Sequence, residues 1–318
     1  MLGRKKPIVV VGSINMDLVT STERIPSEGE TVSGTDFQIH PGGKGANQAV
    51  AVARLSYPVR MIGRLGDDAF GQQLRTHLDS AGVDIEGVKT SQGASGVAVI
   101  MVSQKGENSI VITPGANALL TSRDLDESLE IIRSAGLVLT QLEIPLETVE
   151  HLAHICRREC VPLILDPAPA CELPPHLFEY IAWFTPNQTE AAFFRSRSRG
   201  AEISDPAAVA SDLLDRGVRG VVLKLGARGA YLDCGDGEAQ AIDPFPMKAV
   251  DTTAAGDAFN GAFATGLMLG KTPVESARFA SAGAAISVTR AGAQPSLPSM
   301  AELEQLLDQH EVSNRIDK

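Results

Sequence analysis

The sequence predicts an α/β fold: a parallel β-sheet core covered by helices on both faces, with a small β-sheet lid inserted into it. Short apolar runs rich in Val, Ile and Leu alternate with longer stretches of helical period. Strands that are apolar throughout are buried on both faces, as in parallel sheets flanked by helices. The chain has 318 residues, 30 of them Gly, which suits a large core with an insertion.

The expected elements of the core follow one another in alternating order. The first strand is the run Ile-Val-Val-Val at 8–11, which ends at Gly12. The expected strands span residues 8–11, 59–63, 137–141, 163–166, 184–186 and 221–224. The helices between them span 46–55, 69–81, 146–158 and 207–216, and two apolar, small-residue-rich helices follow at 256–269 and 273–289. Apolar strands separated by helices predict a parallel sheet.

Two segments break this alternation because they have no helical period. Residues 18–40 are polar and β-prone around Pro26 and Gly29, and residues 96–114 predict a hairpin with its turn at 104–107. The two segments form either a separate small sheet or two edge hairpins of the main sheet. We expect the separate sheet, as a lid that excludes water. The core then comprises residues 1–17, 41–95 and 115–318, and the lid comprises 18–40 and 96–114.

Composition excludes several classes of function. The formal net charge of −11 disfavours a general nucleic-acid partner, although a helix N-terminus can still bind phosphate locally. No apolar run approaches the roughly 20 residues that span a bilayer, and the apolar run at 8–11 is too short for a signal peptide. Four cysteines form no disulfide framework. We therefore expect a cytoplasmic protein with no membrane partner.

The common nucleotide-binding and hydrolase motifs are absent from the sequence. No G-x-x-x-x-G-K-[ST] occurs, and no G-x-G-x-x-G follows the first strand. Neither an H-R-D and D-F-G set nor a G-x-S-x-G elbow is present. A Walker-type NTPase, a Rossmann dehydrogenase, a protein kinase and a serine hydrolase are therefore disfavoured.

The strongest positive signal is the segment Asp251-Thr-Thr-Ala-Ala-Gly-Asp257-Ala-Phe-Asn-Gly261. Small side chains before an apolar helix let backbone amides approach an anion, and the helix dipole adds partial positive charge. Asp257 has two interpretations of about equal weight: a carboxylate in the first helical turn that acts as a cap, or a general base beside an anion hole. The second is what phosphoryl transfer to a hydroxyl requires.

Two weaker signals lie near the N-terminus. Pro41-Gly-Gly-Lys-Gly-Ala-Asn47 is a Gly-rich turn that opens a helix, which is either a capped turn or a cradle for a polar ligand. Gly12-Ser-Ile-Asn15-Met-Asp17 directly follows the first strand, where ligands bind in open α/β sheets; the alternative is an Asx turn.

These segments together resemble the ribokinase-like (PfkB) sugar kinases in both order and spacing. The resemblance is carried by 12–17, 41–47, Thr185-Pro-Asn-Gln-Thr-Glu190 and 251–261, and it extends over about residues 8–307. Gln141-Leu-Glu143, Asp166-Pro-Ala-Pro-Ala170 and Ala291-Gly-Ala-Gln-Pro-Ser296 narrow it to members that act on ribose. Asp166 stands where the family often has Asn, and Lys224 where Thr is frequent.

The resemblance implies a site for each ligand. The sugar site would use Asn15, Asp17, Gly43, Lys44, Gly45, Ala46, Asn47, Glu143 and Asp257. The ATP site would use Asn187, Lys224, Leu225, Gly226, Ala227, Arg228, Gly229, Ala255, Gly256 and Ser281, with the anion hole at Ala254, Ala255 and Gly256. Glu190 would organise Mg²⁺ through waters, and Asp251, Thr253, Ser287, Arg290, Gly292 and Ser296 would hold a monovalent cation, K⁺.

The resemblance also implies an activity. We expect ATP-dependent phosphorylation of D-ribose at O5, with Asp257 as base, and a homodimer formed through the lid by analogy. The alternatives are a family kinase of deoxyribose, a nucleoside or a ketohexose, and a catalytically inactive sugar or nucleotide sensor. An intact Asp257 and a complete Ala-Ala-Gly loop disfavour the sensor.

Overall fold

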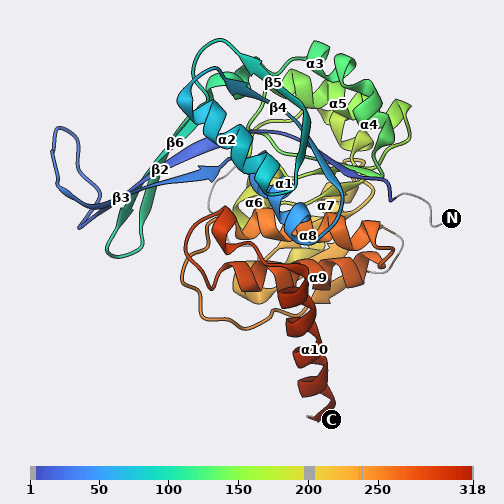
Figure 1. Ribbon diagram of the computed structural model, residues 1–318. Helices are drawn as coiled ribbons and strands as arrows, with labels where there is room; N and C mark the ends of the chain where they lie inside the picture. The colour runs from blue at the N-terminus through green and yellow to red at the C-terminus, as the bar shows by residue number, and fades with distance from the viewer. Residues whose placement is uncertain (1–4, 197–204, 236, 238, 317–318) are drawn as a thin grey trace.

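The computed structural model describes residues 5–196, 205–235, 237 and 239–316, and its centre is a nine-stranded sheet (Figure 1). The strand order is β13-β12-β11-β10-β9-β8-β1-β4-β5. All neighbours from β5 to β11 pair in parallel, whereas β12 and β13 are antiparallel. The sheet strands are β1 (Ile8–Val11), β4 (Val59–Gly66), β5 (Asp84–Ser91), β8 (Leu137–Thr140), β9 (Leu163–Leu165), β10 (Trp183–Phe184), β11 (Val221–Lys224), β12 (Ala230–Asp233) and β13 (Gln240–Ile242).

Helices cover both faces of this sheet. One face carries α1 (Lys44–Arg54), α2 (Ala69–Ser80), α8 (Ala255–Met268), α9 (Pro273–Ser287) and α10 (Met300–Ile316); the other carries α3 (Ser122–Glu127), α4 (Leu129–Ser134), α5 (Leu146–Arg158), α6 (Gln188–Ser196) and α7 (Pro206–Leu214). Strand β1 supplies both cores by alternation: Ile8 and Val10 pack on the α1 and α8 side, and Val9 and Val11 on the α5 side. No helix in the described ranges is long and apolar enough to cross a membrane.

The predicted α/β architecture is confirmed, and each predicted core strand and helix coincides with an observed one to within a few residues. No individual element was predicted at the positions of β5, β12, β13, α3, α4, α6 or α10. Strand β5 carries a polar pattern, DIEGVKTS, and β12 (AYLD) and β13 (QAI) each contain a polar residue among few apolar ones. Such strands lack the continuous apolar run that marks a central parallel strand.

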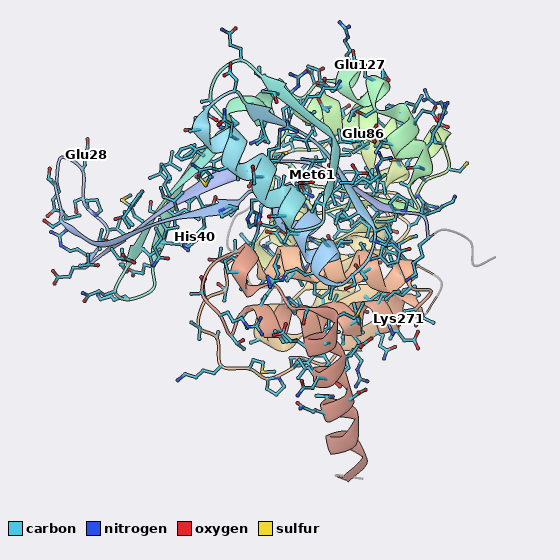
Figure 2. The ribbon with its side chains drawn as sticks, in the orientation of Figure 1. Glu28, His40, Met61, Glu86, Glu127 and Lys271 are labelled. Carbon is cyan, nitrogen blue, oxygen red and sulfur yellow. The ribbon has the colours of Figure 1, made fainter. Side chains whose placement is uncertain are left out.

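The two segments without helical period form one separate sheet, as predicted. It contains β2 (Asn15–Thr22), β3 (Gly34–Gly42), β6 (Gly96–Ser103) and β7 (Asn108–Thr113) in the order β3-β2-β6-β7. Pairing is antiparallel except between β2 and β6, which run parallel. This sheet projects from the body of the molecule, with Glu28 at its far tip and His40 closer to the core (Figure 2). Its ladder begins at Asn15 and ends at Gly42, a few residues inside the segments assigned to the core.

Helices α1 and α8 approach closely at Gly261. A Cβ built on Gly261 would lie 2.5 Å from Cβ of Ala51 and 3.1 Å from the carbonyl oxygen of Gln48. Gly261 lies about one turn beyond Asp257 on α8, while Gln48 lies in the first turns of α1. The missing side chain therefore lets α1 bring its first residues against the start of α8.

We predict that Gly261→Ala lowers both the melting temperature and the turnover number, because the added methyl forces α1 away from α8. Overpacking of a dense core typically costs about 1–3 kcal/mol. Gly283→Ala on α9 is the matched control, since its Cβ would meet no atom closer than the side chain of Ala262 at 3.2 Å, and the nearest backbone atom is the Ala258 carbonyl oxygen at 3.8 Å. Thermal unfolding and steady-state kinetics check this; equal effects of the two variants would contradict the assigned role of Gly261.

Candidate active site

The residues expected from the sequence gather at one edge of the main sheet, beyond the carboxyl ends of its parallel strands. Asn15 and Asp17 follow β1, Glu143 follows β8, and Asn187 follows β10. Lys224 ends β11, and the first turns of α1 and α8 meet at the same edge. Parallel strands place their carboxyl ends together, which explains why segments far apart in sequence share one site.

The start of α8 is built to leave backbone amides free. Its N-cap is Ala254, which has a left-handed backbone at φ 58° and no side-chain hydrogen bond, whereas α2 and α9 are capped by Asp68 and Thr272. Among the described residues, the amides of Gly256 and Asp257 donate to no backbone or side-chain group. Free amides at a helix N-terminus form an anion site. Of the anion hole expected at 254–256, the Ala255 amide already donates to the Thr252 carbonyl at 3.2 Å, whereas the Gly256 amide is free together with that of Asp257.

Asp257 is buried and held by two amide side chains from α1. Asn47 Nδ2 donates to its Oδ2 at 3.0 Å, and Gln48 Nε2 donates to its Oδ1 at 2.9 Å. Burial, opposed by Lys44 and reinforced by Asp166, raises the pKa of Asp257 to about 6. In both hydrogen bonds the carboxylate of Asp257 is the acceptor. The bonds therefore orient its ionised form, which is the form that can accept a proton.

Two further carboxylates, Asp17 and Glu143, and the ammonium of Lys44 surround the sugar side of the site. Asp17 is 9 % exposed, and burial together with the negative charges of Glu143 and Asp257 raises its pKa to about 7. Glu143 accepts a hydrogen bond from Ser13 Oγ at 2.5 Å and from the Lys44 amide at 3.2 Å. Burial acts to lower the pKa of Lys44, but nearby carboxylates, Asp257 foremost, outweigh it and raise the pKa.

Backbone and amide groups complete the sugar side. Gly43 is left-handed at φ 87°, and a Cβ there would lie 2.6 Å from the Asn15 amide. A Cβ on Gly45 would lie 2.6 Å from the Gly12 carbonyl carbon, and the Ala46 amide donates to Ser13 at 2.9 Å. These contacts seat α1 directly on the turn after β1, which is why the Gly-rich segment is needed.

The orientation of Asn15 is set by a residue that sequence reasoning missed. Asn117 Nδ2 donates to Asn15 Oδ1 at 2.7 Å and to the Ile14 carbonyl at 3.1 Å, and its Oδ1 accepts from the Ile14 amide at 2.8 Å. Because Asn15 Oδ1 is occupied, its NH₂ group is the end left to meet a ligand. Asn117 lies 102 residues away, and no motif signalled this pairing.

The nucleotide side is organised by α6 and the loop after β11. Glu190 accepts from the amide of Asn187 at 2.7 Å and from its Nδ2 at 2.8 Å, and burial raises the pKa of Glu190. Gln188 Nε2 donates to the Leu225 carbonyl at 3.1 Å, and its Oε1 accepts from Arg228 at 2.7 Å. These bonds fix the expected loop 224–229.

Gly226 and Gly229 have left-handed backbones, so the loop after β11 turns tightly. Ser281 on α9 is 8 % exposed, and its Oγ has no partner among the described residues.

The two loops expected to hold a monovalent cation are joined through Asp251. Its Oδ1 accepts from Thr253 Oγ1 at 2.6 Å and its Oδ2 from the Gly292 amide at 2.8 Å. Burial acts to raise the pKa of Asp251, but the hydrogen bonds from Thr253 and Gly292 prevail and lower it. Ser287, the last residue of α9, and Ser296 are buried, and Arg290 pairs with Glu302 of α10. Carboxylate, hydroxyl and carbonyl oxygens here suit a hard cation.

Gln48, Asp166, Ser13 and Gln294 were not among the residues expected at the site. Gln48 links Asp257 to Asp166, whose Oδ2 it contacts at 2.9 Å. Gln294 Nε2 donates to Asn47 Oδ1 at 3.1 Å, so the segment that carries Ser296 also orients Asn47. Gln48 and Gln294 lie beside or near Asn47 and Ser296, which the sequence motifs did single out. Position in the sequence alone does not show which amide side chain contacts the carboxylate of Asp257.

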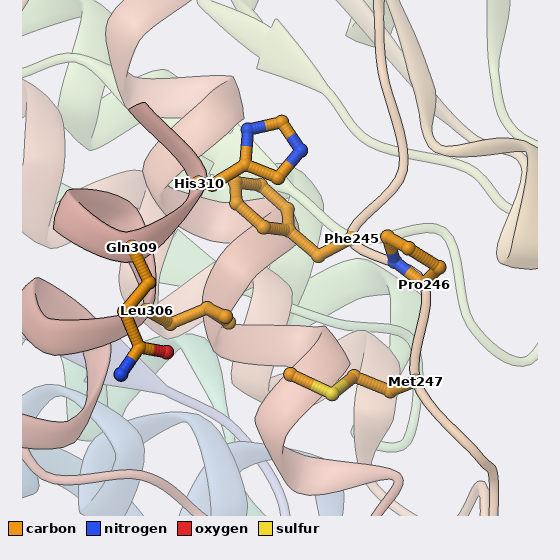
Figure 3. A pocket seen from close by; sticks show the side chains of 6 residues that line it. All are labelled: Phe245, Pro246, Met247, Leu306, Gln309 and His310. Atoms are coloured by element: carbon orange, nitrogen blue, oxygen red, sulfur yellow. The ribbon is translucent and has the colours of Figure 1, made fainter. Parts of the chain in front are cut away.

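A separate pocket of about 190 Å³ lies between the chain before α8 and helix α10 (Figure 3). It is lined by Phe245, Pro246, Met247, Leu306, Gln309 and His310. None of these residues belongs to the expected sugar, nucleotide or cation sites, so the pocket is distinct from the candidate active site.

Comparison with known proteins decides the family. Residues 5–300 match the model of the pfkB family carbohydrate kinases. The chain belongs to this family. A ribokinase of Schizosaccharomyces pombe is 42% identical over 306 residues, which cover 93% of this chain and 96% of the relative. A deoxyribokinase of Salmonella typhimurium is 37% identical over 306 residues, covering 96% and 99%.

A solved pfkB-family structure supports the same assignment. Ribokinase of Arabidopsis thaliana complexed with ribose and ATP superposes with a TM-score of 0.89 at 37% identity, covering 96% of this chain and 99% of that one. The predicted family and fold class are therefore confirmed.

We predict that Asp257→Asn lowers the turnover number by about 10²-fold or more while sugar binding persists, because the change removes the base but keeps its shape. The pKa of about 6 adds a pH test. The carboxylate must be ionised to accept a proton, so kcat/KM of the unmodified protein falls as pH drops through about 6. Near-normal turnover of the variant at pH 8 would exclude Asp257 as the base.

Proposed function

We propose that the protein catalyses ATP-dependent phosphorylation of D-ribose at O5 to give D-ribose 5-phosphate. The observation that carries this is the buried Asp257, oriented by Asn47 and Gln48 directly beside the free amides at the start of α8. A base and an anion hole within one helical turn are what phosphoryl transfer to a hydroxyl needs. The Schizosaccharomyces pombe ribokinase and the Arabidopsis thaliana ribokinase solved with ribose and ATP, both described above, support ribose as the acceptor.

The proposed reaction is an in-line transfer. Asp257 accepts the proton of the ribose O5 hydroxyl as O5 bonds to the γ-phosphorus, and the bond from that phosphorus to the leaving oxygen of ADP breaks. The amides of 254–257 stabilise the charge that develops on the phosphoryl oxygens. The sugar hydroxyls are bound by Asp17, Glu143 and the side-chain amide of Asn15. The positive charge of Lys44 offsets the negative charge of these carboxylates.

Two metal ions complete the proposal. Mg²⁺ would neutralise phosphate charge. Glu190 would hold the ion through waters, because both carboxylate oxygens of Glu190 already accept hydrogen bonds from Asn187. K⁺ would lie between the loops that contain Asp251 and Ser296, which share a hydrogen bond through Gly292. We also infer that the protein works in the cytoplasm.

Deoxyribose remains the second candidate substrate because a deoxyribokinase relative is 37% identical over nearly the full chain. Ribose and 2-deoxyribose differ by one hydroxyl. A site that hydrogen-bonds a hydroxyl discriminates against an analogue that lacks it, because its own buried groups stay unpaired at about 1–3 kcal/mol each.

We predict that ribose is the preferred acceptor, with kcat/KM for 2-deoxyribose lower by about tenfold or more. A coupled assay of ADP release with ATP, Mg²⁺ and K⁺ compares ribose, 2-deoxyribose, fructose and adenosine at matched concentrations. ATP turnover that depends on ribose also excludes a sensor. A higher kcat/KM for any other acceptor would overturn the ribose assignment and leave the family assignment intact.

We predict that K⁺ activates without contacting the substrate, because Asp251 and Thr253 lie on the loop that leads into the anion hole. Rates in K⁺ buffer and in tetramethylammonium buffer of the same ionic strength should differ clearly. Equal rates would mean that the loops at 251–253 and 287–296 hold no activating cation.

The small sheet would act as the lid and as the contact between two subunits. Asn15 and Asp17 start its β2 strand, which places the root of the sheet at the sugar side. Its strands expose large apolar side chains, including Phe37 at 59 % and Val111 at 60 %. Apolar side chains gathered on a projecting sheet favour association, and we infer a homodimer formed through this surface.

We predict that ribose slows amide hydrogen exchange in both 18–40 and 96–114, because β2 and β6 are paired over their full lengths and move together. Exchange mass spectrometry with and without ribose measures this. Protection confined to the α/β core would contradict the lid assignment.

A further inference from the structure

Lys224 and Asp166 form a buried ion pair inside the site. Lys224 Nζ lies 2.8 Å from Asp166 Oδ1, and the two side chains are 11% and 2% exposed. The two residues lie 58 residues apart in sequence. A buried ion pair rarely repays its desolvation through stability alone, so its location needs an explanation.

The ammonium of Lys224 lies beside the proposed anion hole. A Cβ built on Gly256 would lie 3.5 Å from Lys224 Nζ. Apart from the neighbouring residues and the backbone of α8 itself, no other atom of the described residues would lie within 4 Å of it. Gly256 lies in the first turn of α8, where its own amide and that of Asp257 are free among the described residues. The positive charge of Lys224 and the unpaired amides therefore lie at the same helix start.

The opposite side of the ion pair is tied to the base. Asp166 Oδ1 meets Lys224, whereas its Oδ2 accepts from Gln48 Nε2, which also donates to Asp257 Oδ1. The cation beside the anion hole and the carboxylate that accepts the sugar proton are thus joined through the carboxylate of Asp166 and the side-chain amide of Gln48. A shift of Asp166 would move both.

We propose that Lys224 contacts the transferred phosphoryl group and stabilises its charge in the transition state, and that Asp166 is the positioning residue that holds Lys224 there. This inference rests on the proposed function. During transfer Lys224 keeps its three protons, the O5 proton passes to Asp257, and the bond to the leaving ADP oxygen breaks as the O5–phosphorus bond forms. An ammonium has three donors, so Lys224 can retain Asp166 while it binds a phosphoryl oxygen.

The alternative is that the pair only fills and neutralises the interior. A double variant, Lys224→Thr with Asp166→Asn, separates the two, because it removes both charges together and leaves two neutral hydrogen-bonding groups. Lys224→Gln alone would leave Asp166 buried without its cation, which is strongly destabilising. The matched control is the exposed pair of Arg195 and Asp212, 3.0 Å apart, changed to Thr and Asn in the same way.

The first measurement is turnover of ribose by the folded double variant, checked by thermal unfolding. We expect kcat to fall by about tenfold or more, as for loss of a group that stabilises transition-state charge. The KM for ribose should stay within about twofold, since Lys224 lies on the phosphate side. The control pair should change neither value. A double variant with the kcat of the parent protein would overturn the proposal.

The second measurement is calorimetric binding of Mg²⁺ complexes of ADP and of a non-hydrolysable ATP analogue with a γ-phosphate. The double variant should weaken binding of the analogue about tenfold and that of ADP much less. Equal weakening, or none, would mean that Lys224 does not contact the transferred group. The calorimetric measurement needs no turnover, so it decides the role of Lys224 even if the parent protein fails to phosphorylate ribose. That failure would refute the proposed function and not the role of Lys224.

Discussion

The site depends on hydrogen bonds that cross from α1 to the carboxylate of Asp257. Asn47 and Gln48 lie more than 200 residues from Asp257 in sequence, and both donate to it inside the core. A buried carboxylate without such donors would be protonated at neutral pH, and a protonated acid cannot act as a base. The close approach of the two helices at Gly261 makes these bonds possible. The packing of α1 against α8 therefore determines whether Asp257 can act as a base.

The same space holds several acids with few cations to balance them. Asp17 and Asp257 have raised pKa values, whereas Lys44 is held in its charged form by the carboxylates around it, and among the described residues it forms no ion pair. Such an arrangement is costly while the site lacks ligands, because charges of one sign crowd a poorly solvated region. Sugar hydroxyls that donate to the carboxylates relieve part of this cost, so the imbalance favours a polyhydroxylated ligand over a neutral apolar one.

The sequence could predict the core of the fold and the segments of the site, but not how side chains pair. Apolar strands such as 8–11 and 221–224 are recognisable because they are buried on both faces, and the Ala-Ala-Gly run before Asp257 is recognisable because an anion hole needs small residues. Strands β12 (AYLD) and β13 (QAI) mix polar with apolar residues, so they lack the fully apolar run that makes the central strands recognisable. The contacts of Asn117 with Asn15, and of Asp166 with Lys224, depend on which strands become neighbours, and local sequence does not contain that information.

The most direct test of the central claim is a crystal structure of the protein with ribose, ADP, Mg²⁺ and aluminium fluoride, which imitates the phosphoryl group in transfer. The proposed mechanism requires O5 of ribose within hydrogen-bond distance of an Asp257 carboxylate oxygen, in line with the metal fluoride, and the fluoride bound by the amides of Gly256 and Asp257. A ribose whose O5 points away from Asp257, or a fluoride group bound elsewhere than at the start of α8, would contradict it.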